Sequence, residues 1–247
     1  MIAAQFTTTQ VVVVTAVVCF SAMVSAVAGF GFGLMSVPLM SLAIDLHDAV
    51  IVSSLVAVVA NGTQTYLYRR ARDHRLANRL LIACIVGLPF GYAIYALVND
   101  RVLRFTLGAG VIVAVAALAR GVNLAHLGPR MDWALGFTSG VLNTSISTSG
   151  PPLVFDLQAR KLGPEAFTAT INYVFLVSGM IGLCLFAAGG KVHGHELIAG
   201  AFAVPALGVG MLAGLQLRKL VSPERFRVLV LVLLVAGAVA AVAKAFT

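Results

Sequence analysis

The sequence predicts an all-α polytopic membrane protein, because it has few charges and the charges leave long uncharged stretches. Of 247 residues, 60% are hydrophobic and 11% are charged, and the mean hydropathy is +0.99. A soluble domain carries roughly 25% charged residues. Residues 1–68 contain no Lys or Arg. Further uncharged stretches approach or exceed the roughly 20 residues that a helix needs to cross a bilayer.

The uncharged stretches define about eight hydrophobic segments, at 11–43, 48–68, 79–98, 102–119, 132–157, 164–188, 195–217 and 224–244. The net charge of +8 is concentrated in short basic clusters between them. Such clusters orient membrane proteins, so we expect a lipid bilayer around the chain, a cell (inner) membrane location and no nucleic-acid partner. Three scattered cysteines without a CxxC pair predict no disulfide, metal or cofactor.

The two halves resemble each other. "SAVAGFGFGLMSVPLMSL" aligns without a gap on "SGVLNTSISTSGPPLVFD" at an offset of 114 residues, which pairs Ser25 with Ser139 and Pro38 with Pro152. "NDRVLRFTLGAGVIVAVA" resembles "SPERFRVLVLVLLVAGAVA" after one insertion. We therefore predict two four-segment repeats, residues 1–121 and 131–247, joined by a linker at 122–130.

The basic residues predict that the repeats are inverted. If all eight segments cross, the two sides carry nine and eight basic residues, which is no bias. If segment 132–157 is a broken hairpin that enters and leaves on one side, the counts become thirteen and four. The thirteen are Arg69, Arg70, Arg72, Arg75, Arg79, Arg120, Arg130, Arg160, Lys161, Arg218, Lys219, Arg225 and Arg227. By the duplication, segment 11–43 should be a matching broken or re-entrant hairpin from the other side.

Both broken segments contain the residues that a binding site at a helix break needs. Gly29, Pro38, Pro151 and Pro152 are the predicted structural breaks, because proline removes backbone donors and glycine permits unusual dihedrals. Free N–H groups and the macrodipole at a half-helix N-terminus favour an anion, and hydroxyls add donors. The expected substrate-binding residues are Gly31, Gly33, Ser36, Asn143, Thr144, Ser145, Ser147, Thr148, Ser149, Gly150 and Asn172. The alternative is that these small residues serve only close helix packing.

The segments "AGFGFGLMSVPLM" and "GFTSGVLNTSISTSGPPLVFDL" resemble the signature segments of the TauE/SafE family of sulfite exporters and organosulfonate permeases. The resemblance extends over nearly the whole chain and is most specific at the G-x-x-x-G and G-P-P motifs. It implies a secondary transporter of small sulfur-containing anions, such as sulfite, sulfoacetate or related organosulfonates. The run Asn143-Thr144-Ser145 departs from the small residues frequent in the family, so the resemblance does not fix the substrate.

Several alternatives stay open at this point. Asp156 is a candidate for proton coupling or for a simple pair with Arg160. Asn61, Gln64, Asn172 and Tyr173 could line a cavity or bond between helices. The side chains of His193, His195 and Glu196 are of types that bind metals, but we prefer to interpret them as part of a solvated loop. We interpret Asp45, His47 and Asp48 as the acidic first turn of the second segment.

Other functions fit less well. A permease for another small anion such as a carboxylate is the first alternative, and a cation or metal permease is the second. An intramembrane enzyme would need a base to activate Ser145 or Ser147, and no segment supplies one. No Walker A motif is present. The sequence also leaves open whether the chain is a non-transporting subunit and whether it forms a homo-oligomer. It does not determine the direction of transport or the coupled ion.

Overall fold

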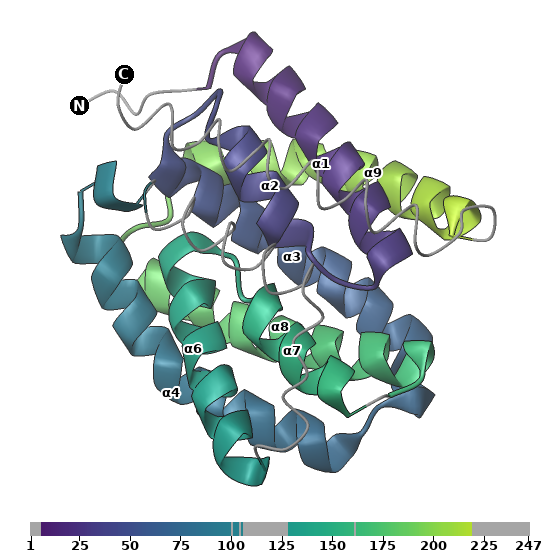
Figure 1. Cartoon of the computed structure of the whole chain (residues 1–247). Helices are drawn as coiled ribbons and strands as arrows, with labels where there is room; N and C mark the ends of the chain where they lie inside the picture. The colour runs from purple at the N-terminus through teal and green to yellow at the C-terminus, as the bar shows by residue number, and fades with distance from the viewer. Residues whose placement is uncertain (1–5, 100, 104, 106–127, 161, 219–247) are drawn as a thin grey trace.

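The computed structural model describes residues 6–99, 101–103, 105, 128–160 and 162–218, and all regular structure among them is helical. Segment 224–244 and most of segment 102–119 and of the linker 122–130 lie outside the described residues. The helices are α1 (Thr8–Ala28), α2 (Phe32–Met40), α3 (Leu46–Tyr68), η1 (Arg69–Ala71), α4 (His74–Leu97), α6 (Gly128–Ile146), α7 (Gly150–Ala159), α8 (Pro164–Ala188) and α9 (Gly194–Leu217) (Figure 1).

Five of the described helices are long and apolar enough to cross a membrane: α1, α3 with η1, α4, α8 and α9. They carry exposed apolar side chains such as Val86, Phe90, Phe202, Val209 and Leu212 on their outer faces. A helix that is apolar on all sides is typical of a bilayer environment. The prediction of an all-helical, multi-pass membrane protein is confirmed.

Each of the two expected broken segments folds back toward the end where it began. At the first, Gln10 Nε2 near the start of α1 donates to the carbonyl oxygen of Ala43, just beyond α2, at 3.1 Å. At the second, Asp132 near the start of α6 pairs with Arg160, the residue that follows α7. α1 with α2 and α6 with α7 are therefore two broken hairpins.

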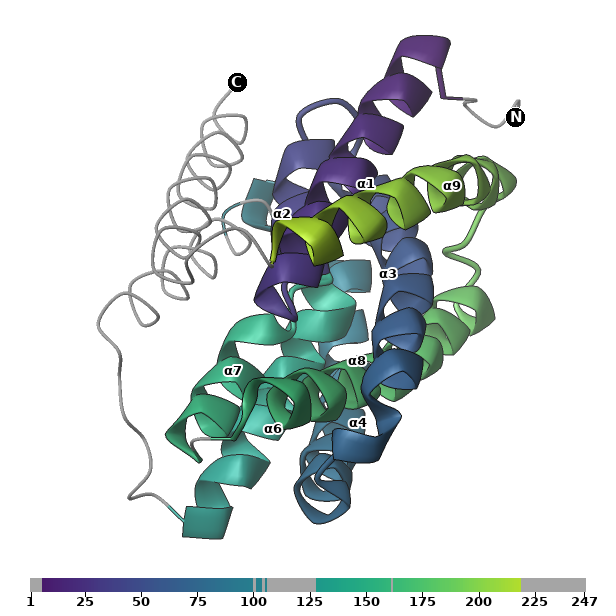
Figure 2. The same cartoon turned by 90° about the vertical axis from the view of Figure 1, so that its right-hand side faces the viewer.

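The two hairpins open at opposite ends of the molecule. α1 begins beside α3 and α9, where Phe6 meets the ring of His195 at 5.0 Å and His195 lies 3.6 Å from Asp48. We call this the His end. α6 begins beside the start of α4, where Arg79 pairs with Asp132 at 2.6 Å. We call this the Arg end. Figure 2 shows α1 starting at the top of the molecule and α6 at the bottom.

Helix packing repeats when the halves are exchanged. α1 packs on α9, and α6 packs in the same way on α4. Both contacts are close at glycines: a Cβ at Gly210 would overlap the carbonyl oxygen of Cys19, and one at Gly140 would overlap that of Cys84. Small residues that bring backbones together are the usual means of packing helices in membranes. The packing role of small residues is therefore real, and it lies mainly in these two interfaces.

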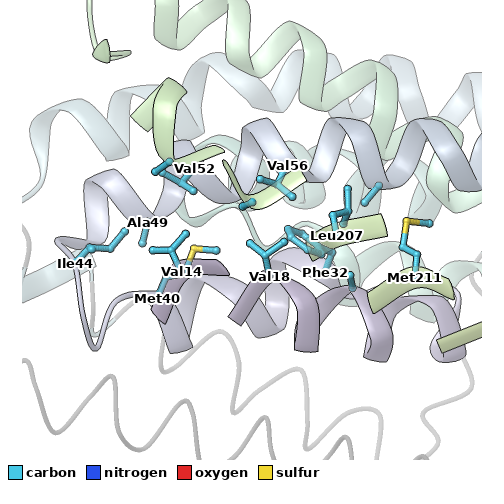
Figure 3. Close-up of a cluster of buried hydrophobic side chains, with 14 residues drawn as sticks. Val14, Val18, Phe32, Met40, Ile44, Ala49, Val52, Val56, Leu207 and Met211 are labelled. Carbon is cyan, nitrogen blue, oxygen red and sulfur yellow. The ribbon is translucent and has the colours of Figure 1, made fainter. Parts of the chain in front are cut away.

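A core of buried apolar side chains holds the first hairpin against α3 and α9 (Figure 3). Phe32, in the first turn of α2, packs there with Val18 of α1, Val56 of α3 and Leu207 of α9. Between membrane helices such contacts stabilise through close van der Waals packing. The start of α2 is therefore fixed in position, which matters for the site that it borders.

Candidate functional site

The first break lies between α1 and α2 and is made by two glycines. Gly29 caps α1 with φ 82°, and Gly31 precedes α2 with φ 95°. Both dihedrals are left-handed, a conformation that glycine adopts without strain. Pro38, expected from the sequence to be a break, lies inside α2, which continues through it to Met40. That expectation is corrected: Pro38 lacks only its own bond to the Leu34 carbonyl, and helical bonding continues past it, since the Ser41 N–H donates to the Val37 carbonyl oxygen at 2.9 Å.

The second break lies between α6 and α7 and is made by serines. α6 ends at Ile146, Ser147 takes φ 52°, and α7 begins at Gly150. Among the described residues other than glycine, Ser147 alone has a positive φ. Pro151 and Pro152 do not occupy the break itself; they form the first turn of α7, where proline is well tolerated because its missing N–H has no partner there.

The two breaks touch each other. A Cβ at Gly33 would overlap the carbonyl oxygen of Ser147, so the start of α2 lies directly against the unwound backbone of the second break. Gly150, at the start of α7, lies against the ring of Phe30 in the first break. Glycine at position 33 is required by this approach. The breaks thus form one site, although they are more than a hundred residues apart in the sequence.

Each break is held by a helix of the other half. Asn172 of α8 donates from Nδ2 to the carbonyl oxygen of Gly29 at 2.8 Å. In the corresponding place, Ser54 of α3 lies 3.1 Å from Ser147 in a bond between the two hydroxyls. Unwound backbone inside a membrane costs several kcal/mol for each unsatisfied polar group. The Asn172 bond satisfies such a group at the first break, the Ser54 bond ties the side chain of the second break to α3, and together they couple the two halves.

A cavity opens between the breaks. It leaves ≈ 40 Å³ accessible to the centres of water-sized molecules, enough for a few waters or one small oxyanion. Its lining is Gly31, Phe32, Gly33, Leu34, Ser54, Ala57, Val58, Asn61, Asn143, Ser147, Ser149, Gly150, Phe175 and Gly179. Among the described residues, the lining contains no Lys, Arg, Asp, Glu or His, so no described side chain of the lining can act as a base for Ser147.

The cavity receives the N-terminal ends of α2 and α7. Phe32, Gly33 and Leu34 form the first turn of α2, and the N–H groups of a first turn have no acceptor within their helix. Neither N-cap residue, Gly31 for α2 and Ser149 for α7, makes a side-chain capping bond. At α7 the prolines leave Gly150 as the only first-turn residue with an N–H, and Ser147 and Ser149 add hydroxyls. The positive ends of two half-helix dipoles therefore face one cavity, which favours an anion.

Six of the expected binding residues line this cavity: Gly31, Gly33, Asn143, Ser147, Ser149 and Gly150. The other five lie outside the lining, and their polar groups are engaged elsewhere. Thr144 donates to the carbonyl oxygen of Leu88, Ser145 to that of Val141 and Thr148 to that of Ile146. Ser36 bonds Ser53 at 2.7 Å, and Asn172 holds Gly29.

Two lining residues of α3 extend the expected set. Ser54 carries no binding prediction from the sequence, and Asn61 is one of the polar residues left open between cavity and packing. They are seven residues apart, which places them on one face of a helix, and Ala57 and Val58 lie between them on that face. The signal available in the sequence was this helical spacing of Ser54 and Asn61, although Ser53, Thr63 and Gln64 of the same segment are polar too. Asn143, across the cavity, donates from Nδ2 to Ser178 at 3.1 Å.

Asp156 lies away from the cavity, in an ion cluster at the Arg end. Its carboxylate pairs with Arg160 Nε at 3.3 Å, one helical turn away, and Arg160 also pairs with Asp132. Asp132 pairs in turn with Arg79 of α4. Burial acts to lower the pKa of the Arg160 guanidinium, but the Asp156 and Asp132 carboxylates outweigh it and raise that pKa. The cluster therefore joins α4, α6 and α7 with Arg160 fully charged.

Comparison with known proteins agrees with the geometry. A model of the family "Sulfite exporter TauE/SafE" matches residues 14–241. The chain is 24% identical over 212 residues to the probable sulfite/organosulfonate exporter TauE of Cupriavidus necator, a match that covers 81% of each chain. No solved structure matches the chain significantly. With five candidate spans, two broken hairpins and a family match over most of its length, the chain belongs to the TauE/SafE sulfite exporter family of membrane transporters.

Proposed function

We propose that this protein is a secondary transporter of small sulfur-containing anions, with sulfite or the head group of an organosulfonate bound in the cavity between α2 and α7. The observation that carries the proposal is that two half-helix N-termini open on one cavity, and that no described residue of its lining is charged. Amide dipoles attract an anion in such a place. The relative in Cupriavidus necator, named as a probable sulfite/organosulfonate exporter, supports the substrate class.

The donor set suits a small oxyanion that must be released again. Three N–H groups of α2, one of α7, the hydroxyls of Ser147 and Ser149 and the amide of Asn61 surround the cavity. A fixed Lys or Arg would add a full charge and slow release, whereas partial charges hold the ion more weakly. Phe32 and Phe175 supply the apolar part of the lining. The size of the cavity favours sulfite over longer organosulfonates in this conformation.

We propose that the two halves are inverted repeats and that their relative motion opens the cavity to one side of the membrane at a time. The hairpins open at opposite ends, and the helix contacts repeat when the halves are exchanged; both facts support inversion. In such folds one repeat rocks against the other around a site at mid-membrane. The Arg end carries Arg69, Arg72, Arg79, Arg160 and Arg218, so the preference for basic residues on the cytoplasmic side favours that end as cytoplasmic, with the cell (inner) membrane as location.

At the Arg end, Asp156 remains a candidate for coupling a proton or other ion to transport. Its pair with Arg160, the alternative from the sequence, is present. We propose that this cluster must open for the substrate to leave on that side. Substitution of Asp156 by Asn should then alter transport without altering equilibrium binding of the anion.

A ligand panel on the purified protein tests the substrate class. Sulfite, sulfoacetate, isethionate, taurine, lactate and chloride are added in turn, and binding is read by thermal shift and by calorimetry. We expect sulfite to stabilise the protein most. Asn61→Asp should abolish that effect, because it places a carboxylate in the cavity. Thr63→Val, on the exposed side of the same helix, is the matched control and should bind normally.

The panel also separates the alternatives. A carboxylate such as lactate bound more tightly than sulfite would indicate a permease for another organic anion at the same cavity. If sulfite stabilised Asn61→Asp as much as wild type, the anion site would be contradicted. If a divalent cation instead stabilised the variant more than wild type, a cation permease would be favoured.

A further inference from the structure

Three side chains with metal-ligand groups come together at the His end, far from the substrate cavity. Asp48 lies in the first turn of α3, and His195 and Glu196 lie in the first turn of α9. One ligand atom of each lies within 4.8 Å of the others. Asp48 and His195 lie in different halves of the sequence, so only the fold reveals the cluster.

The spacing of these groups fits a shared ion better than a direct bond. His195 Nε2 lies 3.6 Å from Asp48 Oδ1, which is too long for a hydrogen bond. Two ligands held at 2.0–2.2 Å from one tetrahedral ion lie about 3.4 Å apart. The groups therefore converge on a point between them without satisfying one another.

Helix dipoles account for part of the cluster but not for all of it. Carboxylates are favoured in first turns, and Glu196 also accepts a hydrogen bond from the His193 N–H. However, Glu196 is 1% exposed, and among the described residues neither it nor Asp48 pairs with Lys or Arg. His195 Nδ1 is buried without a partner in the described part of the chain. Among the described residues the two carboxylates therefore face imidazoles only: His195 Nε2 lies 3.6 Å from Asp48, and His193 Nδ1 lies 3.6 Å from Glu196.

We infer that Asp48, His195 and Glu196 form a binding site for a divalent transition-metal ion. One imidazole and two carboxylates suit Zn²⁺ and its neighbours in the first row, and three protein ligands leave a position for water. The hydrogen bond from the His193 N–H orients Glu196, as outer groups commonly do for ligands. Bound metal would join α3 of the first half to α9 of the second. Because α3 also carries Ser54 and Asn61 into the cavity, the ion would hold the His end closed.

The test is calorimetry of Zn²⁺ binding to purified, chelator-treated protein, with Mn²⁺ and Ca²⁺ for comparison. Wild type should bind one Zn²⁺ per chain. Asp48→Asn and His195→Ala should each weaken that binding by at least about tenfold, the loss that even a second-shell change can cause. His74→Gln is the matched control, since His74 is an exposed histidine in the first turn of α4 at the other end, and it should bind as wild type does.

Folding is monitored separately by gel filtration and by sulfite binding, which all these variants should retain. Glu196→Gln is a third variant, because it keeps the shape of the capping side chain while removing its charge, and it should also weaken Zn²⁺ binding. Unchanged Zn²⁺ affinity in the Asp48→Asn, His195→Ala double variant would overturn the site, as would the absence of stoichiometric binding by wild type. Neither result would affect the proposal for sulfite, which is tested at Asn61.

Discussion

The two breaks build the same geometry from opposite chemistry. The first uses Gly29 and Gly31, offers bare backbone and keeps every N–H in the first turn of α2. The second uses Ser147 and Ser149, and Pro151 and Pro152 remove two N–H groups from the first turn of α7. Amides therefore come mainly from one side of the cavity and hydroxyls from the other. A small oxyanion has several oxygens, and this division lets it accept bonds from both sides.

The difference also shows how the halves support each other. The glycine break leaves a carbonyl oxygen, which Asn172 satisfies with an amide donor. The serine break carries a side chain into the cavity, which Ser54 meets with a hydroxyl. Different partners follow from different breaks, although they occupy corresponding helices. The site is thus specified by pairs of residues across the repeat, and each pair can be changed separately.

Removing the close approach between the breaks should have the largest effect. Gly33→Ala places a Cβ on the carbonyl oxygen of Ser147, backbone that has no room to yield. We expect loss of sulfite transport in proteoliposomes and a much less stable protein. Gly208→Ala is the control, because nothing lies within 4 Å of a Cβ there, and it should behave as wild type. Normal transport by Gly33→Ala would show that the breaks do not need to touch.

The partner of the glycine break should matter more for stability than the partner of the serine break. Asn172→Ala leaves the Gly29 carbonyl without its donor, at about 1–3 kcal/mol. Ser54→Ala should cost only about 0.5–1.5 kcal/mol, because Ser147 faces the cavity and can bond water there. Unfolding in mixed detergent with increasing dodecyl sulfate measures both. Equal losses would mean that the two breaks are held alike.

Relief of the strain at Ser147 should change stability in the opposite direction. Ser147→Gly removes a left-handed residue with a side chain, which costs roughly 1–2 kcal/mol, so the variant should unfold later than wild type. Ser147→Ala keeps the strain and should not. Both lose the hydroxyl, so both should bind sulfite more weakly. If only Ser147→Gly lost affinity, the fixed backbone and not the hydroxyl would be the group that contacts the ion.

Uncharged length and the Gly and Pro residues were enough to predict helical spans with two breaks, because both depend on local sequence. The register between the halves was not predictable in the same way. The alignment at an offset of 114 pairs Gly33 with Ser147, whereas α3 begins at Leu46 and α8 at Pro164, an offset of 118. The two offsets differ by four residues, which is about one helical turn. Aligning the halves at the wrong offset therefore still matches apolar face with apolar face, and the sequences look almost as similar.

Residue roles at the site divide in the same manner. Gly31, Gly33 and Ser147 could be chosen from the sequence because they lie at the breaks. Ser54 was not chosen, and Asn61 stayed open between cavity and packing, since the place of both at the cavity depends on how α3 packs against the other half. Thr144 and Ser145 have the right chemistry, but helix geometry turns their hydroxyls to the backbone of α4 and α6. Composition identifies candidates, and only packing decides which of them face the cavity.

Selenite, which has the shape and charge of sulfite and a heavy scatterer at its centre, allows the anion site to be located directly. Crystals of the protein soaked in selenite should give one anomalous selenium peak between the first turns of α2 and α7, beside Gly33 and Ser147, and Asn61→Asp should remove it. An empty cavity, with selenium peaks only at the arginines of the Arg end, would contradict the account.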